Sequence, residues 1–321
     1  MSKIWVFAEM AGDQVSPVSL EVLSGARALG DELEAVVLDP QAQRAKTTLG
    51  EYGASTVYLG SAPEYGNHVG QPHAAVLAHL VLAHRPDLLL FGATYDGRDI
   101  CARLSARLGL TVVANALAVN SSDAGFTVLT SIFGATQNVI TRVQGPTPCV
   151  LVRPKSYPAE AVAGGEPRVV EVALPADAPR GARRLESVVA PASGPKLEDA
   201  RVVVSGGRGL QDPTNFRLVE EVAELLHGAV GASRAVVDAG WVPYSRQVGQ
   251  TGKTVKPDVY LACGISGAMQ HTVGMKGAAH IVAINKDRDA PIFKLSDLGI
   301  VGDAVKVLPE LSAELRARGV G

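Results

Sequence analysis

Segments of strand length alternate with segments of helical periodicity along the N-terminal half of the chain. The continuous apolar run DLLLFGAT at residues 87–94 is typical of a strand that a sheet buries on both faces. Pro86 ends the helical pattern before it, and Gly109 closes the helical pattern after it. Elements in this order pack as a mostly parallel sheet with helices on its two faces. We therefore expect a doubly wound α/β domain over residues 1–154, closed by a few antiparallel strands from the strand-rich residues 111–153.

The amino-acid composition of the chain changes after this first domain. Residues 155–195 are rich in Pro, Gly and Ala, which indicates a linker, and RVVEVAL at residues 168–174 predicts one short strand within it. A second α/β domain with a parallel sheet is predicted over residues 196–321, because apolar strands again alternate there with helical segments. A length of 321 residues accommodates two domains of this kind.

Composition and charge exclude several classes of protein. A formal net charge of −2 gives no basis for nucleic-acid binding. Cys101, Cys149 and Cys263 stand far apart, so we expect neither a disulfide framework nor a metal site. No secretory segment precedes the first predicted strand, and the apolar run at residues 76–84 is too short to insert into a membrane. We therefore expect a cytoplasmic protein.

Four glycine-bearing turns follow apolar runs in the C-terminal domain, at residues 205–209, 248–253, 263–271 and 300–304. Ligands of open α/β sheets bind at the carboxyl ends of strands, where glycine lets backbone N–H groups approach a ligand closely. Any single turn of this kind is as consistent with a helix cap as with a ligand. Four turns on one small domain favour an extended ligand over a small anion.

The stretch GQTGKT at residues 249–254 is similar to half of an ATP-binding phosphate loop. That motif needs a glycine five positions before Gly252, and Gln247 stands there. The motif also needs a helix after the lysine, whereas Pro257 and a predicted strand follow within a few residues. The ATP-binding interpretation therefore fails, and the stretch needs another function.

Six segments of the C-terminal domain resemble, in order, the alpha subunit of electron-transfer flavoprotein: SGGRG, GASRAVVDAGWVP, QVGQTGKTVKPDVYLACGISGAMQH, GMKG, IVAINKD and APIFKLSDLGIVGD. The N-terminal half resembles that family more loosely, through KIWVFAE, DLLLFGAT and GRDICARLSARL. The resemblance implies that the C-terminal domain binds FAD and that the N-terminal domain contacts a beta subunit in a heterodimer.

The resemblance also implies an electron carrier rather than an enzyme, with a place in electron transport and fatty acid beta-oxidation. The expected electron donors are flavin-dependent dehydrogenases such as acyl-CoA dehydrogenases, and the expected acceptor is a membrane quinone oxidoreductase. AMP, where the family carries it, is expected in the beta subunit and not in this chain.

Single residues acquire roles from the same resemblance. Arg234 would lie against the isoalloxazine ring and favour a negatively charged reduced flavin; the plainer alternative is an arginine in a surface ion pair. His271 would donate a hydrogen bond to the flavin C2 carbonyl; the plainer alternative is a histidine whose ring nitrogens already have hydrogen-bond partners in the protein or in solvent. Thr251 would present its hydroxyl to flavin N5.

The remaining implied contacts lie along the phosphates and the adenosine. Arg208 would contact the phosphates, and Asn285 and Asp303 the adenosine end. The whole set of cofactor-binding residues that the resemblance implies, with no catalytic residue among them, is Arg208, Ser233, Arg234, Gln247, Val248, Gly249, Gln250, Thr251, Gly252, Ser266, Gly267, Ala268, Met269, Gln270, His271, Asn285, Asp287, Asp303 and Ala304.

A nucleotide-dependent α/β enzyme that binds NAD or thiamine diphosphate is the alternative from another class. Such an enzyme needs a nucleophile or a general base, and Cys263 and His271 are the candidates near the glycine turns. The stretch GATYDGRD at residues 92–99 is a further candidate nucleotide loop, for which we expect a structural and interface role instead.

Overall fold

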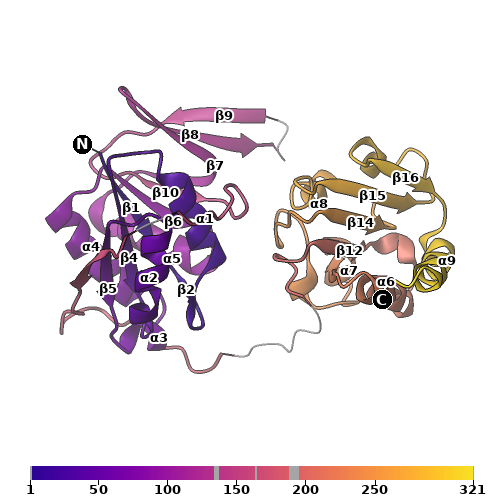
Figure 1. The fold of residues 1–321 in the computed structure, drawn as a ribbon, viewed down its shortest axis with the longest axis horizontal. Coiled ribbons are helices and arrows are strands. Elements are labelled where there is room, and N and C mark those ends of the chain that lie inside the picture. Colours follow the sequence, from indigo (N-terminus) through magenta and orange to yellow (C-terminus); the bar gives the residue numbers. More distant parts are fainter. Residues whose placement is uncertain (1, 134–136, 163–164, 188–194, 321) are drawn as a thin grey trace. The chain divides into compact units, whose positions relative to one another are not determined.

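The computed structural model describes residues 2–133, 137–162, 165–187 and 195–320, and the chain forms two compact units, Met1–Val188 and Val189–Gly321 (Figure 1). Each unit has a parallel sheet of its own with helices around it. The predicted α/β class with two domains is therefore confirmed.

A nine-stranded sheet forms the centre of the first unit, in the order β11-β5-β4-β1-β6-β10-β7-β8-β9. Every neighbouring pair from β11 to β7 is parallel, whereas β8 pairs antiparallel with both β7 and β9. The strands are β1 (Lys3–Phe7), β4 (Glu32–Leu38), β5 (Thr56–Gly60), β6 (Leu88–Gly92), β7 (Val112–Ser122), β8 (Gly125–Ile132), β9 (Gln137–Arg142), β10 (Cys149–Val152) and β11 (Arg168–Glu171), and β2 (Met10–Ala11) pairs separately with β3 (Gln14–Val15).

Helices cover both faces of this sheet, as the alternation predicts. Ile4 and Val6 of β1 belong to one apolar cluster, which α1 joins, and Trp5 and Phe7 belong to a second cluster, which α4 and α5 join. Gly109 caps α5 in the left-handed conformation, at φ 67°, where glycine has no Cβ to clash. The helices are α1 (Pro17–Ala26), α2 (Lys46–Glu51), α3 (Glu64–Asn67), α4 (Gln71–His84) and α5 (Tyr95–Leu108), with the 3-10 turn η1 (Ala42–Ala45) before α2.

Two features of the first unit differ from the expectation. The strand β10 lies between β6 and β7 in the parallel sheet, and not among antiparallel closing strands, because all its residues are buried and need neighbours on both sides. The strand β11 pairs in parallel with β5, so it extends the first sheet. The two compact units divide after residue 188. Residues 188–194 of the expected linker lie outside the described residues.

The second unit is built on five parallel strands in the order β13-β12-β14-β15-β16. Its helices α6 and α9 share one apolar cluster on one face (Figure 1), and Tyr260 and Met275 belong to a separate cluster. The strands are β12 (Val202–Gly206), β13 (Ala229–Ala232), β14 (Val259–Cys263), β15 (His280–Asn285) and β16 (Leu298–Val301). The helices are α6 (Phe216–Leu225), α7 (Arg234–Asp238), α8 (Met269–Thr272) and α9 (Ala304–Ala317), with 3-10 turns η2 (Arg208–Leu210), η3 (Pro213–Asn215), η4 (Tyr244–Arg246) and η5 (Pro291–Lys294).

The order of strands in the second sheet reverses beside β12. The chain passes from β12 to β13 on one side and then returns to β14 on the other side. Because all neighbouring strands are parallel, their carboxyl ends share one edge, and the point of reversal is where open α/β sheets bind ligands. None of the helices in the described part of the chain is long and apolar enough to cross a membrane.

Candidate functional site

The glycine turns predicted from the sequence meet at the carboxyl edge of the second sheet. Gly207, after β12, donates its N–H to the carbonyl of Cys263 at 2.9 Å, and Gly209 donates to Gly264 at the same distance. A Cβ added to Gly264 would lie 2.8 Å from the backbone of Gly209, so the two turns touch without room for side chains. The residues after β12 and β14 therefore form one continuous backbone surface at the reversal point.

The loop of residues 247–253 is fastened to the same edge by its backbone. Val248 donates to the carbonyl of Ala232 at the end of β13, at 2.9 Å, and Gln250 donates to the carbonyl of Gln270 at 2.7 Å. A Cβ on Gly252 would lie 2.3 Å from the carbonyl oxygen of Gln247, a contact that no side chain accommodates. The loop thus forms a second wall beside the turn that leads to α8.

Within this loop, the lysine is held by a carboxylate and the threonine by an amide. Lys253 Nζ pairs with both oxygens of Glu198, at 2.7 and 2.9 Å. Gln247, whose side chain is buried, donates from Nε2 to the Thr251 hydroxyl oxygen at 2.9 Å. Thr251 itself is exposed, and its hydroxyl proton remains available to a ligand. The lysine therefore has a structural partner, which agrees with the failure of the phosphate-loop interpretation.

His271 lies on α8 and is a buried ionisable group at this edge with a strongly shifted pKa. Its ring is buried, Nε2 lies 2.9 Å from the hydroxyl oxygen of Tyr260, and Nδ1 is buried with no hydrogen-bond partner among the described residues. Burial lowers the pKa of His271 to about 4, against an opposing effect of the Val248 backbone. The imidazole is therefore neutral at pH 7. A buried polar atom without a partner is costly, and it is typical of a position that a ligand completes.

The predicted arginines are both exposed but differ in their contacts. Arg234, at the start of α7, donates from Nε to Asp238 at 3.0 Å in an exposed i,i+4 ion pair, which is the plainer alternative that the sequence left open. Such exposed ion pairs contribute only about 0–1 kcal/mol to stability, so the Arg234 guanidinium can leave Asp238 for another partner at little cost. Arg208, on η2, pairs with no carboxylate in the described part of the chain. Ser233 precedes α7 without capping it through its side chain, and its N–H donates to Gly206 at 3.0 Å.

The residues expected at the adenosine end follow β15 and β16. Asn285 donates from Nδ2 to the Ile265 carbonyl at 2.9 Å and accepts from the N–H of Asp287, also at 2.9 Å. Asp303 caps α9 by accepting from Val305 N–H at 3.0 Å. These side chains therefore already support the fold, and Ala304 beside them is buried.

The predicted set divides into an exposed group and a buried frame. The members exposed at the surface are Arg208, Arg234, Gln250, Thr251, Ser266, Ala268, Met269, Gln270 and Asp287. The buried members are Gln247, Val248, Gly249, Gly267, His271 and Ala304, and Ser233, Gly252, Asn285 and Asp303 are partly exposed. Backbone hydrogen bonds bring the turns that carry Arg208, Ser233, Gln250 and His271 to one edge.

Two contributors were missed by the sequence analysis. Tyr260 was assigned only to a strand, yet it holds His271, and Glu198 neutralises Lys253. Glu198 lies 55 residues from Lys253 and Tyr260 lies 11 residues from His271, so neither contact follows the spacing of a turn or a helix. Cys263 is fully buried, and burial raises the pKa of its thiol. It therefore lacks the thiolate character of a nucleophile.

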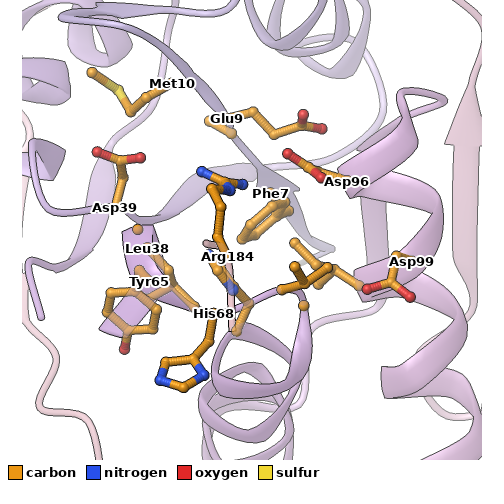
Figure 2. A pocket seen from close by; sticks show the side chains of 16 residues that line it. Phe7, Glu9, Met10, Leu38, Asp39, Tyr65, His68, Asp96, Asp99 and Arg184 are labelled. Atoms are coloured by element: carbon orange, nitrogen blue, oxygen red, sulfur yellow. The ribbon is translucent and has the colours of Figure 1, made fainter. Parts of the chain in front are cut away.

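The first unit contains a separate cavity of about 140 Å³ at the carboxyl ends of β1 and β4 and the start of α5. Figure 2 shows the Arg184 side chain, in this view, between Asp39 on one side and Glu9 and Asp96 on the other. Burial raises the pKa of Glu9 to about 7, and Thr94 donates to its carboxylate. No group of three or more His, Cys, Asp or Glu side chains in the described ranges is placed to hold a metal ion.

The stretch at residues 92–99 borders this cavity. Thr94 caps α5 by accepting from the N–H of Gly97, and a Cβ on Gly97 would lie 2.2 Å from the carbonyl oxygen of Gly92. The glycine at position 97 is therefore required by close backbone packing, which supports a structural role for the stretch.

Comparisons with known proteins match both units. The family model of the electron transfer flavoprotein domain matches residues 4–177, and that of the electron transfer flavoprotein FAD-binding domain matches residues 196–276. The electron transfer flavoprotein subunit alpha of Mycobacterium tuberculosis is 41% identical, over 99% of this chain and 99% of its own. The protein of the same name from Syntrophomonas wolfei is 38% identical, over 98% and 100% of the two chains. Protein FixB of Clostridium saccharobutylicum is 37% identical, over 98% and 96%.

Proposed function

The chain belongs to the electron transfer flavoprotein alpha subunit family, and from this premise we propose that it is the FAD-binding subunit of a heterodimeric electron carrier. The observation that carries the proposal is Nδ1 of His271, which is buried without a hydrogen-bond partner among the described residues, on the helix that follows β14 at the carboxyl edge of the second sheet. FAD is an extended ligand with carbonyl, phosphate and hydroxyl groups, and the turns that carry Arg208, Ser233, Gln250 and His271 lie together along one edge of the sheet.

The residues present fit FAD in their chemistry. His271 would donate to a flavin carbonyl, and Thr251 would direct its hydroxyl at the ring. Arg208, which has no carboxylate partner in the described ranges, would contact the phosphates. When bound, FAD supplies the electron-transfer chemistry itself, whereas the protein supplies binding, orientation and electrostatics. No general acid or base on this chain is needed for that role.

Arg234 has to leave Asp238 to reach a flavin. Because their ion pair is exposed, the exchange costs about 1 kcal/mol or less. The guanidinium stays charged at all physiological pH values, so at the ring it would favour the reduced, negatively charged flavin. The remaining predicted residues, Ser233, Gln247 to Gly252, Ser266 to Gln270, Asn285, Asp287, Asp303 and Ala304, complete the proposed site.

We place the contact with the beta subunit on the first unit. The edge strand β9 exposes all its residues, and Ile140 is 71% exposed. Figure 1 shows β8 and β9 extending away from the helices of that unit. An open sheet edge with exposed apolar side chains is suited to cover by a partner chain. AMP, if the complex carries it, is assigned to the beta subunit.

The proposed carrier works in the cytoplasm, in electron transport that includes fatty acid beta-oxidation. It would accept electrons from flavin-dependent dehydrogenases such as acyl-CoA dehydrogenases and pass them to a membrane quinone oxidoreductase. No observation favours the alternative of an enzyme that uses NAD or thiamine diphosphate, because Cys263 is a buried, protonated thiol and His271 has no orienting carboxylate among its described contacts.

Co-expression with a candidate beta chain tests the proposal. The purified heterodimer is expected to be yellow, with flavin absorption bands that disappear during titration with dithionite. A colourless heterodimer that takes up no added FAD would refute the proposal, and binding of NAD in its place would favour the alternative.

A further inference from the structure

We propose that Gln247 is a positioning residue of the ligand edge. Its side chain holds the hydroxyl of Thr251 and acts on the ligand through that hydroxyl, without touching the ligand itself. The part of this inference that concerns FAD rests on the function proposed above. The part that concerns the hold on Thr251 rests on hydrogen bonds within this chain alone.

Gln247 is enclosed within the loop of residues 247–253, with an exposed fraction of only 2%. Its N–H donates to the carbonyl of Tyr244 at 2.9 Å, and its carbonyl accepts from the N–H of Lys253 at 2.7 Å. A Cβ added to Gly252 would lie 2.9 Å from Cγ of Gln247, so the side chain packs against the backbone of the glycine. The backbone polar groups of Gln247 are therefore used within the loop, and its side chain offers almost no surface to a ligand.

The side-chain amide of Gln247 binds the side chain of Thr251. Nε2 donates to the Thr251 hydroxyl oxygen at 2.9 Å. A hydroxyl group has one proton to donate and two lone pairs that accept. Because the amide N–H occupies one lone pair, the hydroxyl proton is directed away from the amide. Thr251 is exposed, so this proton is available as a donor to a ligand at the surface.

A second hydrogen bond holds the backbone of the same threonine. The hydroxyl of Tyr244 donates to the carbonyl of Thr251. Tyr244 begins the 3-10 turn η4 and Gln247 follows its last residue, while Arg246 of that turn pairs with Glu220 on α6. One turn, fastened to a helix, therefore holds both oxygen atoms of Thr251. Because Tyr244 is 53% exposed, water competes for its bond, and the buried amide of Gln247 is the stronger constraint.

Removing the amide should weaken the ligand through the loss of this orientation. Methionine is similar to glutamine in length and carries no amide, so Gln247→Met deletes the hydrogen bond with a small change in volume. The Thr251 hydroxyl would then rotate freely, and ordering it would oppose binding. We expect FAD affinity to fall roughly threefold to tenfold, the effect of one neutral hydrogen bond. Thr251→Val, which deletes the hydroxyl itself, should lower FAD affinity by a similar factor.

A double-variant cycle separates action through Thr251 from any other effect of Gln247. The FAD-free heterodimer is titrated with FAD for the wild type, the two single variants and the double variant. In the Thr251→Val background, Gln247→Met should change FAD affinity by less than about twofold, because no hydroxyl is left to position. Ser312→Ala is the control: it deletes a buried hydroxyl on α9 without a partner among the described residues, and the effect of Gln247→Met should be undiminished in its background. Equal losses from Gln247→Met with and without the Thr251 hydroxyl would overturn the proposal, as would an unchanged FAD affinity in Gln247→Met.

Urea unfolding of the same four FAD-free heterodimers tests the hydrogen bond without the cofactor. The shift of the unfolding midpoint in the double variant should be smaller than the sum of the two single shifts, and a shift equal to that sum would overturn the proposal. If none of the proteins binds FAD, the proposed function fails, while the unfolding cycle still decides whether Gln247 holds Thr251. If Gln247→Met does not fold, Thr251→Ser decides the inference. It keeps the hydroxyl that Gln247 holds and should bind FAD within about threefold of the wild type, whereas a loss equal to that of Thr251→Val would overturn the proposal.

Discussion

Replacing Gly252 by alanine tests whether the backbone of the 247–253 loop shapes the ligand edge. The new Cβ would lie 2.3 Å from the Gln247 carbonyl oxygen, which also accepts the N–H of Lys253 at 2.7 Å. The loop has to open, which breaks this hydrogen bond at a cost of about 1 kcal/mol and adds about 1–3 kcal/mol of overpacking. The total of about 2–4 kcal/mol predicts a loss of FAD affinity of roughly 30-fold or more.

The assay is a fluorescence titration of the FAD-free heterodimer with FAD, followed by thermal unfolding with and without the cofactor. Gly277→Ala is the matched control, since its Cβ would meet only the Lys256 side chain, at 3.5 Å. The control is expected to bind FAD like the wild type. If Gly252→Ala binds FAD within threefold of the wild type and unfolds at the same temperature, the loop does not depend on this contact and the reasoning is refuted.

Three further predictions use charge and pH. The pKa of His271 falls from 6.5 to about 4 on folding, so the folded state binds fewer protons than the unfolded state between these pH values. The free energy of unfolding should therefore fall by about 3 kcal/mol in all as the pH falls from about 6.5 to 4. Urea unfolding of His271→Gln should lack this part of the pH dependence. The pKa of Glu9 rises from 4.5 to about 7 on folding, so stability is lost as the pH rises through that window. Glu9→Gln should therefore raise the melting temperature at pH 8 and not at pH 4. An equal shift of the melting temperature at the two pH values would contradict this prediction. Lys253→Ala should keep FAD affinity within about threefold of the wild type, because Glu198 already pairs with the lysine. Arg208→Ala should lower FAD affinity roughly tenfold or more. A large loss of FAD affinity in Lys253→Ala would mean that the lysine contacts the phosphates of FAD.

Local patterns predicted the elements of the fold but not all of their neighbours. The alternation of apolar strands and helices identified both sheets, and the glycine at the end of α5 marked its boundary. The place of β10 was mispredicted because a buried strand looks alike whether it pairs with one neighbour or another. The strand β11 was predicted as a strand but assigned to a linker because Pro- and Gly-rich residues surround it, and its pairing with β5 spans more than a hundred residues.

In the candidate site too, local features could be predicted from the sequence and contacts between distant residues could not. Glycine turns after apolar strands were recognised in the sequence, since strand ends and turns are local properties, and the structure brings these turns together at one edge of the second sheet. The contacts that tune individual groups were not predictable. Tyr260 meets His271, and Glu198 meets Lys253, only after the sheet has formed. The identities of the residues that would contact FAD came from the family resemblance and stay predictions.

The second unit joins its turns through backbone hydrogen bonds and glycine contacts rather than through the side chains exposed at the edge. For protein engineering, this separates two sets of positions. Gly207, Gly249 and Gly264 maintain the shape and tolerate no replacement, whereas Met269 and Gln250 point outward and are open to variation. A library confined to the outward positions should therefore yield folded variants whose redox properties differ, without disturbing the architecture that holds them in place.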